Sequence, residues 1–137
     1  MSKIIFLLSI FISFNVLATL NKDVGCFSSD SKKINVKFVS VYDDGVSLGY
    51  VKYKNAKDSI PLLFSSINQE ENSEGRPEET TITWLEIIDG RLNGQYVVMS
   101  QGARYYNLIY KGKNGKTISL NENLDAYNDE HSNCIWK

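Results

Sequence analysis

A chain of 137 residues with a formal net charge of −1 can bury one hydrophobic core, and it carries no excess of basic residues. This balance argues against nucleic acid as a partner, because binding to phosphates needs a positively charged surface. The composition therefore predicts one globular domain.

The first 18 residues, MSKIIFLLSIFISFNVLA, have the anatomy of a secretory signal peptide. Lys3 supplies the positive region, residues 4–14 form an almost unbroken apolar run, and a small-residue exit ends at Ala18. We expect cleavage after Ala18, which leaves 19–137 as a single β domain. A transmembrane anchor is the alternative, but the apolar run is short for a bilayer span. Export to the periplasm is the prediction, with secretion as the alternative.

The two cysteines, Cys26 and Cys134, stand near the two ends of the mature chain. In an exported protein an even pair predicts a disulfide, which would tie the ends of the domain together. Lipidation of Cys26 is the alternative, but the charged spacer before it does not fit a lipobox. It would also leave Cys134 as an odd thiol.

The first half of the mature chain reads as antiparallel strands. Residues 33–42 (KINVKFVSVY) alternate, with Ile34, Val36 and Phe38 on one face. The turn residues 43–45 lead to a return strand over 46–53. A third strand is expected over 59–66, where Pro61 predicts an edge or a bulge.

Residues 68–79 (NQEENSEGRPEE) interrupt this pattern with five glutamates and no apolar residue. We expect a loop here. The functional interpretation is a docking or cation-binding loop that uses Glu70, Glu71, Glu74 and Arg76. The alternative is a solvated hairpin tip whose charge resists edge-to-edge pairing.

The stretch 80–120 organises the second half of the chain. It predicts strands over 80–88, 95–100, 104–110 and 116–120, joined by turns at Asp89–Gly90 and Gly112–Gly115. Helical periodicity reaches at most one or two turns, within 120–128. The whole pattern indicates an all-β antiparallel barrel or sandwich of about seven or eight strands. We favour the barrel because closure leaves no free edge.

The residues needed for catalysis are sparse. His131 is the lone histidine and lies in a polar tail, and both cysteines are expected to be oxidised. Carboxylate pairs among Glu70, Glu71, Glu78, Glu79 and Glu86 would suit a glycosidase, but most of them fall in the expected loop. We therefore expect a protein that is not an enzyme and that uses no cofactor and no metal.

The segment 99–106 (MSQGARYY) is the best candidate for partner binding. It combines a glycine that permits a sharp bend with a hydroxyl, a guanidinium and aromatic rings, which are types that carry binding energy at interfaces. The candidate residues, with two lysines one strand further on, are Ser100, Gly102, Arg104, Tyr105, Tyr106, Lys111 and Lys113. The alternative is that most of them are ordinary strand residues and that Gly102 marks a bulge.

The run Ser100, Gly102, Ala103, Arg104 and Tyr105, followed by Lys111–Gly112, resembles the central motif of the periplasmic and membrane-bound inhibitors of C-type lysozyme. The terminal cysteines agree with that family in outline. It forms a small antiparallel β-barrel and directs a motif serine and a lysine toward the catalytic carboxylates of lysozyme. The resemblance implies that Ser100 is the inserted serine and that Lys111 or Lys113 is the cation. Gln101 departs from the motif, and the segment 42–89 is longer than usual.

Three functions remain in view at this point. The first is an exported inhibitor that blocks a lysozyme-like, cell-wall-degrading enzyme through a polar, cationic loop. The second is a periplasmic immunity protein that neutralises a toxic effector, with the acidic loop docking a basic toxin. The third is a cell-wall sugar- or peptide-binding module that uses exposed Trp84, Tyr105 or Tyr106. Each needs a partner other than nucleic acid.

Overall fold

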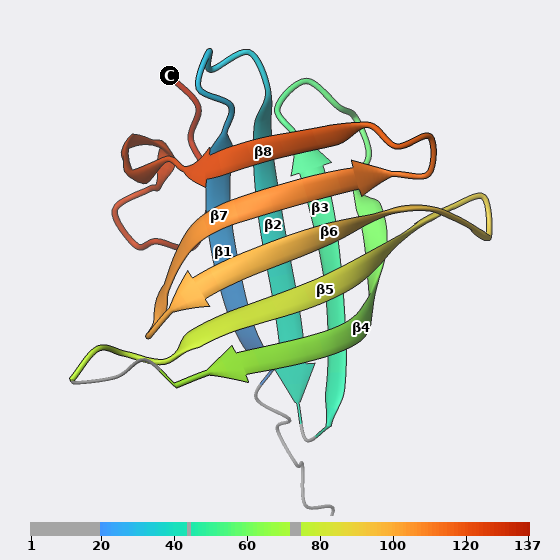
Figure 1. Ribbon diagram of the computed structural model, residues 1–137. Helices are drawn as coiled ribbons and strands as arrows, with labels where there is room; N and C mark the ends of the chain where they lie inside the picture. Colours follow the sequence, from blue (N-terminus) through green and yellow to red (C-terminus); the bar gives the residue numbers. More distant parts are fainter. Residues whose placement is uncertain (1–19, 44, 72–74) are drawn as a thin grey trace, which may run out of the picture.

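A computed structural model of the chain describes residues 20–43, 45–71 and 75–137. The predicted signal peptide, 1–18, lies outside the described residues. Within the described part the chain forms eight strands and one short 3₁₀ helix (Figure 1). They are β1 (Asn21–Ser28), β2 (Asn35–Asp43), β3 (Val46–Tyr53), β4 (Ile60–Glu70), β5 (Glu79–Ile88), β6 (Arg91–Gln101), β7 (Arg104–Gly112), β8 (Thr117–Glu122) and η1 (Leu124–Ala126).

The strands form a closed antiparallel barrel in which each strand pairs with its neighbour in sequence. The all-β prediction is confirmed, and closure decides between the barrel and the sandwich. The last pairing, between β8 and β1, is short: Phe27 pairs with Glu122 and Ser28 with Asn121. Figure 1 shows β8 crossing β1 and β2 near one end of the molecule.

The alternating patterns of the sequence placed most strands correctly. Val36 and Phe38 of β2 point into the core, as their period-two spacing predicted, and β3 has the predicted bounds. The strand β1 was not predicted, because the polar residues and the glycine in NKDVGCFS hide the alternation. Pro61 pairs with Tyr50 of β3, yet it precedes Leu62, the first residue of β4 that pairs with β5. The proline thus sits where β4 has a partner on one side only.

The expected loop over 68–79 is shorter than predicted. Asn68 pairs with Thr81, and Glu70 pairs with Glu79, so the β4–β5 hairpin continues into the acidic segment. Polar residues are tolerated there because both faces of this hairpin end are largely open to solvent. The hairpin extends beyond the body of the barrel in Figure 1.

The C-terminal segment closes the domain. The helical pattern expected within 120–128 is wrong for its first part, since β8 runs to Glu122 and only Leu124–Ala126 is helical. The predicted disulfide between Cys26 and Cys134 is confirmed, with a Cα–Cα distance of 5.7 Å. It holds the tail against β1.

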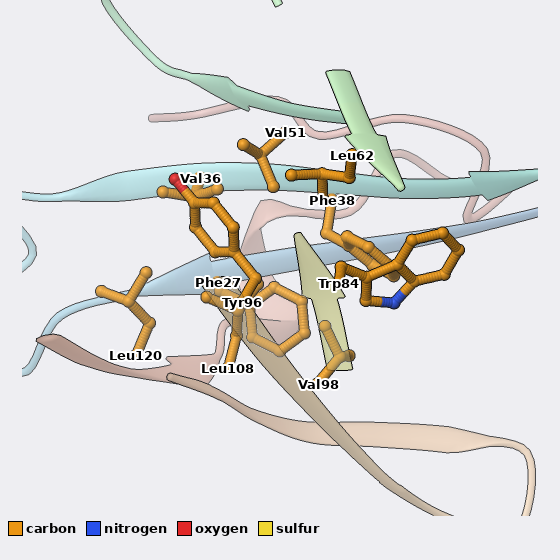
Figure 2. Close-up of a cluster of buried hydrophobic side chains, with 10 residues drawn as sticks. All are labelled: Phe27, Val36, Phe38, Val51, Leu62, Trp84, Tyr96, Val98, Leu108 and Leu120. Carbon is orange, nitrogen blue, oxygen red and sulfur yellow. The ribbon is translucent and has the colours of Figure 1, made fainter. Parts of the chain in front are cut away.

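The core fills the barrel from inward-facing positions of β1 to β8. Ten fully or nearly fully buried side chains meet there (Figure 2): Phe27, Val36, Phe38, Val51, Leu62, Trp84, Tyr96, Val98, Leu108 and Leu120. They come from every strand, because alternate residues of each strand point inward. Each such side chain stabilises the fold by about 1.5–3 kcal/mol through burial.

Candidate functional site at the mouth of the barrel

The barrel has two different ends. The end formed by the β2–β3, β4–β5 and β6–β7 connections is called the mouth below. It holds a cavity of about 860 Å³ that opens to solvent. Four of the predicted partner-binding residues line this cavity: Ser100, Gly102, Arg104 and Tyr105. The structure therefore brings the middle of the 99–106 segment to a concave surface.

The inner wall of the cavity is aromatic and aliphatic. Phe64 and Ile67 of β4, with Ile82 and Trp84 of β5, contribute to its lining. Phe64 and Ile67 are three residues apart and would normally face opposite sides of the sheet. A bulge in β4 between Phe64 and Ser66 shifts the register by one residue, so that both side chains reach the cavity.

A second bulge aims Tyr105 inward. Ser100 pairs with Tyr105 and Met99 pairs with Asn107, which leaves Tyr106 as the extra residue on β7. Tyr105 therefore lies on the inner side of the barrel, where its ring contacts Phe38 at 5.8 Å between centroids. Tyr106 points outward, and its hydroxyl donates a hydrogen bond to Glu79 Oε1 at 2.5 Å.

Trp84 is buried, with 2% of its surface exposed, so the expectation of an exposed Trp84 is wrong. Its inward position on β5 follows from the same alternation that places Ile82 and Glu86 inside. The indole packs edge-on against Phe38 and Phe64. Gly49 leaves room for it, since a Cβ there would lie 3.1 Å from Trp84 Cζ3. Figure 2 shows Trp84 beside Phe38 within the core cluster.

The β6–β7 turn forms one lip of the mouth and is held in place. Gly102 has φ of +60°, a conformation that favours glycine, and its N–H donates to the carbonyl oxygen of Glu78 at 3.1 Å. The Gln101 side chain donates to the carbonyl oxygen of Pro77 at 3.4 Å. The turn itself stays exposed. A preformed, solvent-facing turn results.

The end of β8 and the segment that follows it form the part of the rim next to this turn. Arg104 Nε donates to Glu122 Oε2 at 3.0 Å, and this is the one ion pair among the described residues. The hydroxyl of Tyr127 donates to the other oxygen of Glu122 at 2.9 Å. The ring of His131 lies 5.1 Å from that of Tyr127 between centroids, and both residues line the cavity. Arg104 is thus oriented by the carboxylate beside it.

Charges at the mouth come mostly from residues that the sequence pattern did not single out. Lys22 and Asp23 of β1 and Asp43 of β2 line the cavity. Burial raises the pKa of Tyr105 to about 12, against a hydrogen bond from Ser40 that lowers it, and the charge of Asp23 raises it further. Tyr105 is therefore a neutral hydrogen-bonding group at physiological pH. Because β1 itself was not predicted, no signal pointed to Lys22 or Asp23.

The two predicted lysines lie at the other end of the barrel. Lys111 is six residues along β7 from Tyr105, the partner of Ser100, and Lys113 follows in the β7–β8 turn. At roughly 3.3 Å per residue this separation is about 20 Å. The structure does not bring either lysine together with Ser100.

The predicted docking loop adjoins the mouth. Glu70, Glu71 and Arg76 are exposed on the β4–β5 hairpin, and Glu74 lies outside the described residues. The same hairpin contacts the β6–β7 turn through Pro77 and Glu78. The two candidate surfaces are therefore neighbours.

Glu86, one of the carboxylates considered for catalysis, is buried toward the opposite end. It lies seven residues along β5 from Glu79, a span of about 23 Å. Its oxygens accept hydrogen bonds from Asn93 Nδ2 at 2.6 Å, Tyr110 Oη at 3.1 Å and Tyr96 Oη at 3.2 Å. The carboxylate thus serves as an acceptor in a buried network, far from the other glutamates.

Comparison of the chain with protein-family models, curated proteins and solved structures gave no match. Among the described residues, no helix has the length and apolar character needed to cross a membrane. In the same part of the chain, no three His, Cys, Asp or Glu side chains gather in a way that would hold a metal ion.

Proposed function

We propose that this chain is an exported inhibitor that binds a lysozyme-like, cell-wall-degrading enzyme through the β6–β7 turn. The observation that carries the proposal is the geometry of Gly102, which is exposed at the mouth and held by Glu78 from the neighbouring hairpin. A preformed turn loses little conformational entropy on binding, which favours affinity. The hydroxyl of Ser100 and the guanidinium of Arg104 flank it.

The cation in this proposal differs from the one that the family resemblance implies. Lys111 and Lys113 are at the far end of the barrel, so they do not act together with Ser100. Lys22 and Arg104 line the same mouth as Ser100 and take that role. A hydroxyl and a cation side by side complement a cleft lined by carboxylates.

The test is inhibition and calorimetric binding with purified mature protein and lysozymes of several types at micromolar concentration. The double variant Lys22→Glu, Arg104→Glu should bind at least about tenfold more weakly, since it reverses both positive charges at the mouth. The matched control, Lys111→Glu with Lys113→Glu, makes the same charge change at the far end and should leave affinity unchanged. Absence of binding to every lysozyme type, or equal losses in both variants, would contradict the proposal.

A second candidate, an immunity protein, is favoured by the protruding acidic hairpin. Glu70, Glu71 and Glu78 are all exposed there and offer negative charge to a basic toxin. Reversal of these three charges should abolish protection of cells challenged with the toxin. Protection that survives the reversal would rule out docking through this hairpin. Protein carrying the same reversal should still bind a lysozyme if the first proposal is correct.

A further inference from the structure

Trp84, one of the residues that line the cavity at the mouth, carries a polar atom that the fold does not satisfy. Trp84 Nε1 is buried and has no hydrogen-bond partner among the described residues. A buried donor without a partner costs about 1–3 kcal/mol, so most such groups in folded proteins are satisfied. Here the indole also lines the cavity.

The orientation of the indole follows from its contacts. Its Cε3 and Cζ3 atoms lie against β3, at the distances that a Cβ on Gly49 would meet, 3.2 Å and 3.1 Å. Nε1 is on the opposite long edge of the ring system and therefore faces away from β3. Phe64 stands edge-on to the same indole at 5.9 Å between centroids. An aromatic side chain therefore packs against the indole that carries this donor.

The volume and the polarity of the mouth cavity define which class of ligand would fill it. A volume of about 860 Å³ suits a small organic ligand. Phe64 and Ile67 are 42% and 50% exposed, and both line the cavity. Large apolar side chains that remain this accessible inside a concavity offer a binding surface for an apolar body.

Charge at the mouth argues against an anionic ligand. Three carboxylates line the cavity, those of Asp23, Asp43 and Glu122, against the two cations Lys22 and Arg104. Arg104 is already paired with Glu122. An uncharged molecule inside the cavity avoids the repulsion that a carboxylate or sulfonate would meet from these three groups. A carboxylate of a protein partner would instead meet the side chain of Arg104, which is 64% exposed.

We propose that the mouth cavity is a binding site for a small, uncharged aromatic molecule whose carbonyl oxygen accepts a hydrogen bond from Trp84 Nε1. This site adjoins the exposed turn to which the protein partner was assigned, since Ser100, Gly102 and Arg104 also line the cavity. It does not depend on whether that partner is a lysozyme. An eight-stranded barrel is just wide enough to hold one small ligand in this way.

Three probes with the same bicyclic ring test the proposal: 2-acetylnaphthalene, 2-ethylnaphthalene and 2-naphthoate. The readout is the indole N–H resonance of Trp84 in ¹⁵N-labelled mature protein, assigned with the variant Trp136→Phe. The ketone should bind saturably and shift this resonance. The hydrocarbon should bind about three- to tenfold more weakly, because it lacks the acceptor, and the carboxylate should bind most weakly.

Two variants test separately the contribution of the hydrogen bond and that of the open volume of the cavity. Trp84→Phe should reduce affinity for the ketone to that for the hydrocarbon, as followed by ligand-observed NMR. If Trp84→Phe does not fold, the variant Ile67→Trp tests the cavity instead. It places a larger side chain at an accessible position, which narrows the mouth and should weaken binding of the ketone. Leu63→Trp is its control: Leu63 is similarly exposed on β4 but does not line the cavity. Equal binding of ketone and hydrocarbon, or an unmoved Trp84 resonance with all three probes, would overturn the proposal.

Discussion

Cys26 and Cys134 form a disulfide next to the shortest seam of the barrel. The seam is the β8–β1 pairing, which involves only Phe27 with Glu122 and Ser28 with Asn121. The disulfide spans 108 residues of sequence and ties the tail across β1. The backbone of Asn123 also donates to the carbonyl oxygen of Cys26 at 2.8 Å. Closure of the barrel thus relies on the tail as well as on the strands.

Replacement of both cysteines, Cys26→Ala with Cys134→Ala, should lower the free energy of unfolding by about 2–5 kcal/mol. The crosslink restricts the unfolded chain, and its loss also frees the tail from the seam. Urea denaturation measures the change, and hydrogen exchange should show β1 and β8 losing protection first. Reduced wild-type protein is the control and should match the double variant. A loss below about 1 kcal/mol would contradict this account.

Tyr127→Phe should cost about 1–2 kcal/mol of stability. The Tyr127 hydroxyl accepts from the Cys26 N–H at 3.1 Å and donates to Glu122, so one oxygen joins β1, the end of β8 and the tail. Thermal unfolding provides the measurement. Tyr42→Phe is the matched control, since Tyr42 is 43% exposed, and it should change stability by less than about 0.5 kcal/mol. Equal effects of the two changes would argue against the bridging role.

Glu86→Ala should destabilise the fold by about 3 kcal/mol, because it leaves the donors of Asn93, Tyr96 and Tyr110 without their buried acceptor. Denaturant unfolding measures the loss. Glu79→Ala removes a carboxylate that accepts one exposed hydrogen bond, from Tyr106, and should cost less than about 1 kcal/mol. The network would be unimportant if both variants proved equally stable.

Stability should fall at alkaline pH. The pKa of Tyr105 is raised from 10.0 to about 12, chiefly by burial, so the folded state holds this proton more tightly than the unfolded state. The resulting stabilisation is fully present below pH 10 and is lost as the pH rises to about 12. Urea denaturation across this range should therefore show a falling free energy of unfolding. Tyr105→Phe should reduce the slope by the contribution of this one phenol. Part of the slope should remain, because the pKa values of Tyr53, Tyr96, Tyr106, Tyr110 and Tyr127 are raised as well. A slope that does not change at all would contradict the burial of Tyr105.

Gly102→Ala should destabilise the β6–β7 turn by about 1 kcal/mol, because the residue has a positive φ. A Cβ there would also lie 3.2 Å from Pro77 Cβ and disturb the contact with the neighbouring hairpin. Gly115→Ala, in the β7–β8 turn at the other end of the barrel, is the control: its φ is +84° and a Cβ would meet nothing within 4 Å. Only Gly102→Ala should weaken the proposed binding to a lysozyme. Equal binding by both variants would separate the turn from the partner site.

The strand pattern was predictable where side chains alternate cleanly, as in 33–42, and where short turns such as Asp89–Gly90 punctuate the chain. The end of β4 was not, because pairing with the threonines of β5 carries polar residues into the ladder as far as Glu70. The same reasoning selected Ser100, Gly102, Arg104 and Tyr105, which do meet at one surface. The same reasoning also selected Lys111 and Lys113, which do not lie at that surface. The extended strand β7 carries them to the other end of the barrel, although they are close to Ser100 in sequence.

The sequence by itself determined the fold class, the disulfide and the location of one exposed turn, since each depends on local pattern or on a count of residues. Only the tertiary structure decided which side chains share the mouth. Bulges at Ser65 and Tyr106 switch the faces of their strands, and a one-residue shift of this kind reverses inside and outside. Those shifts bring Phe64, Ile67 and Tyr105 to the cavity that Trp84 also lines.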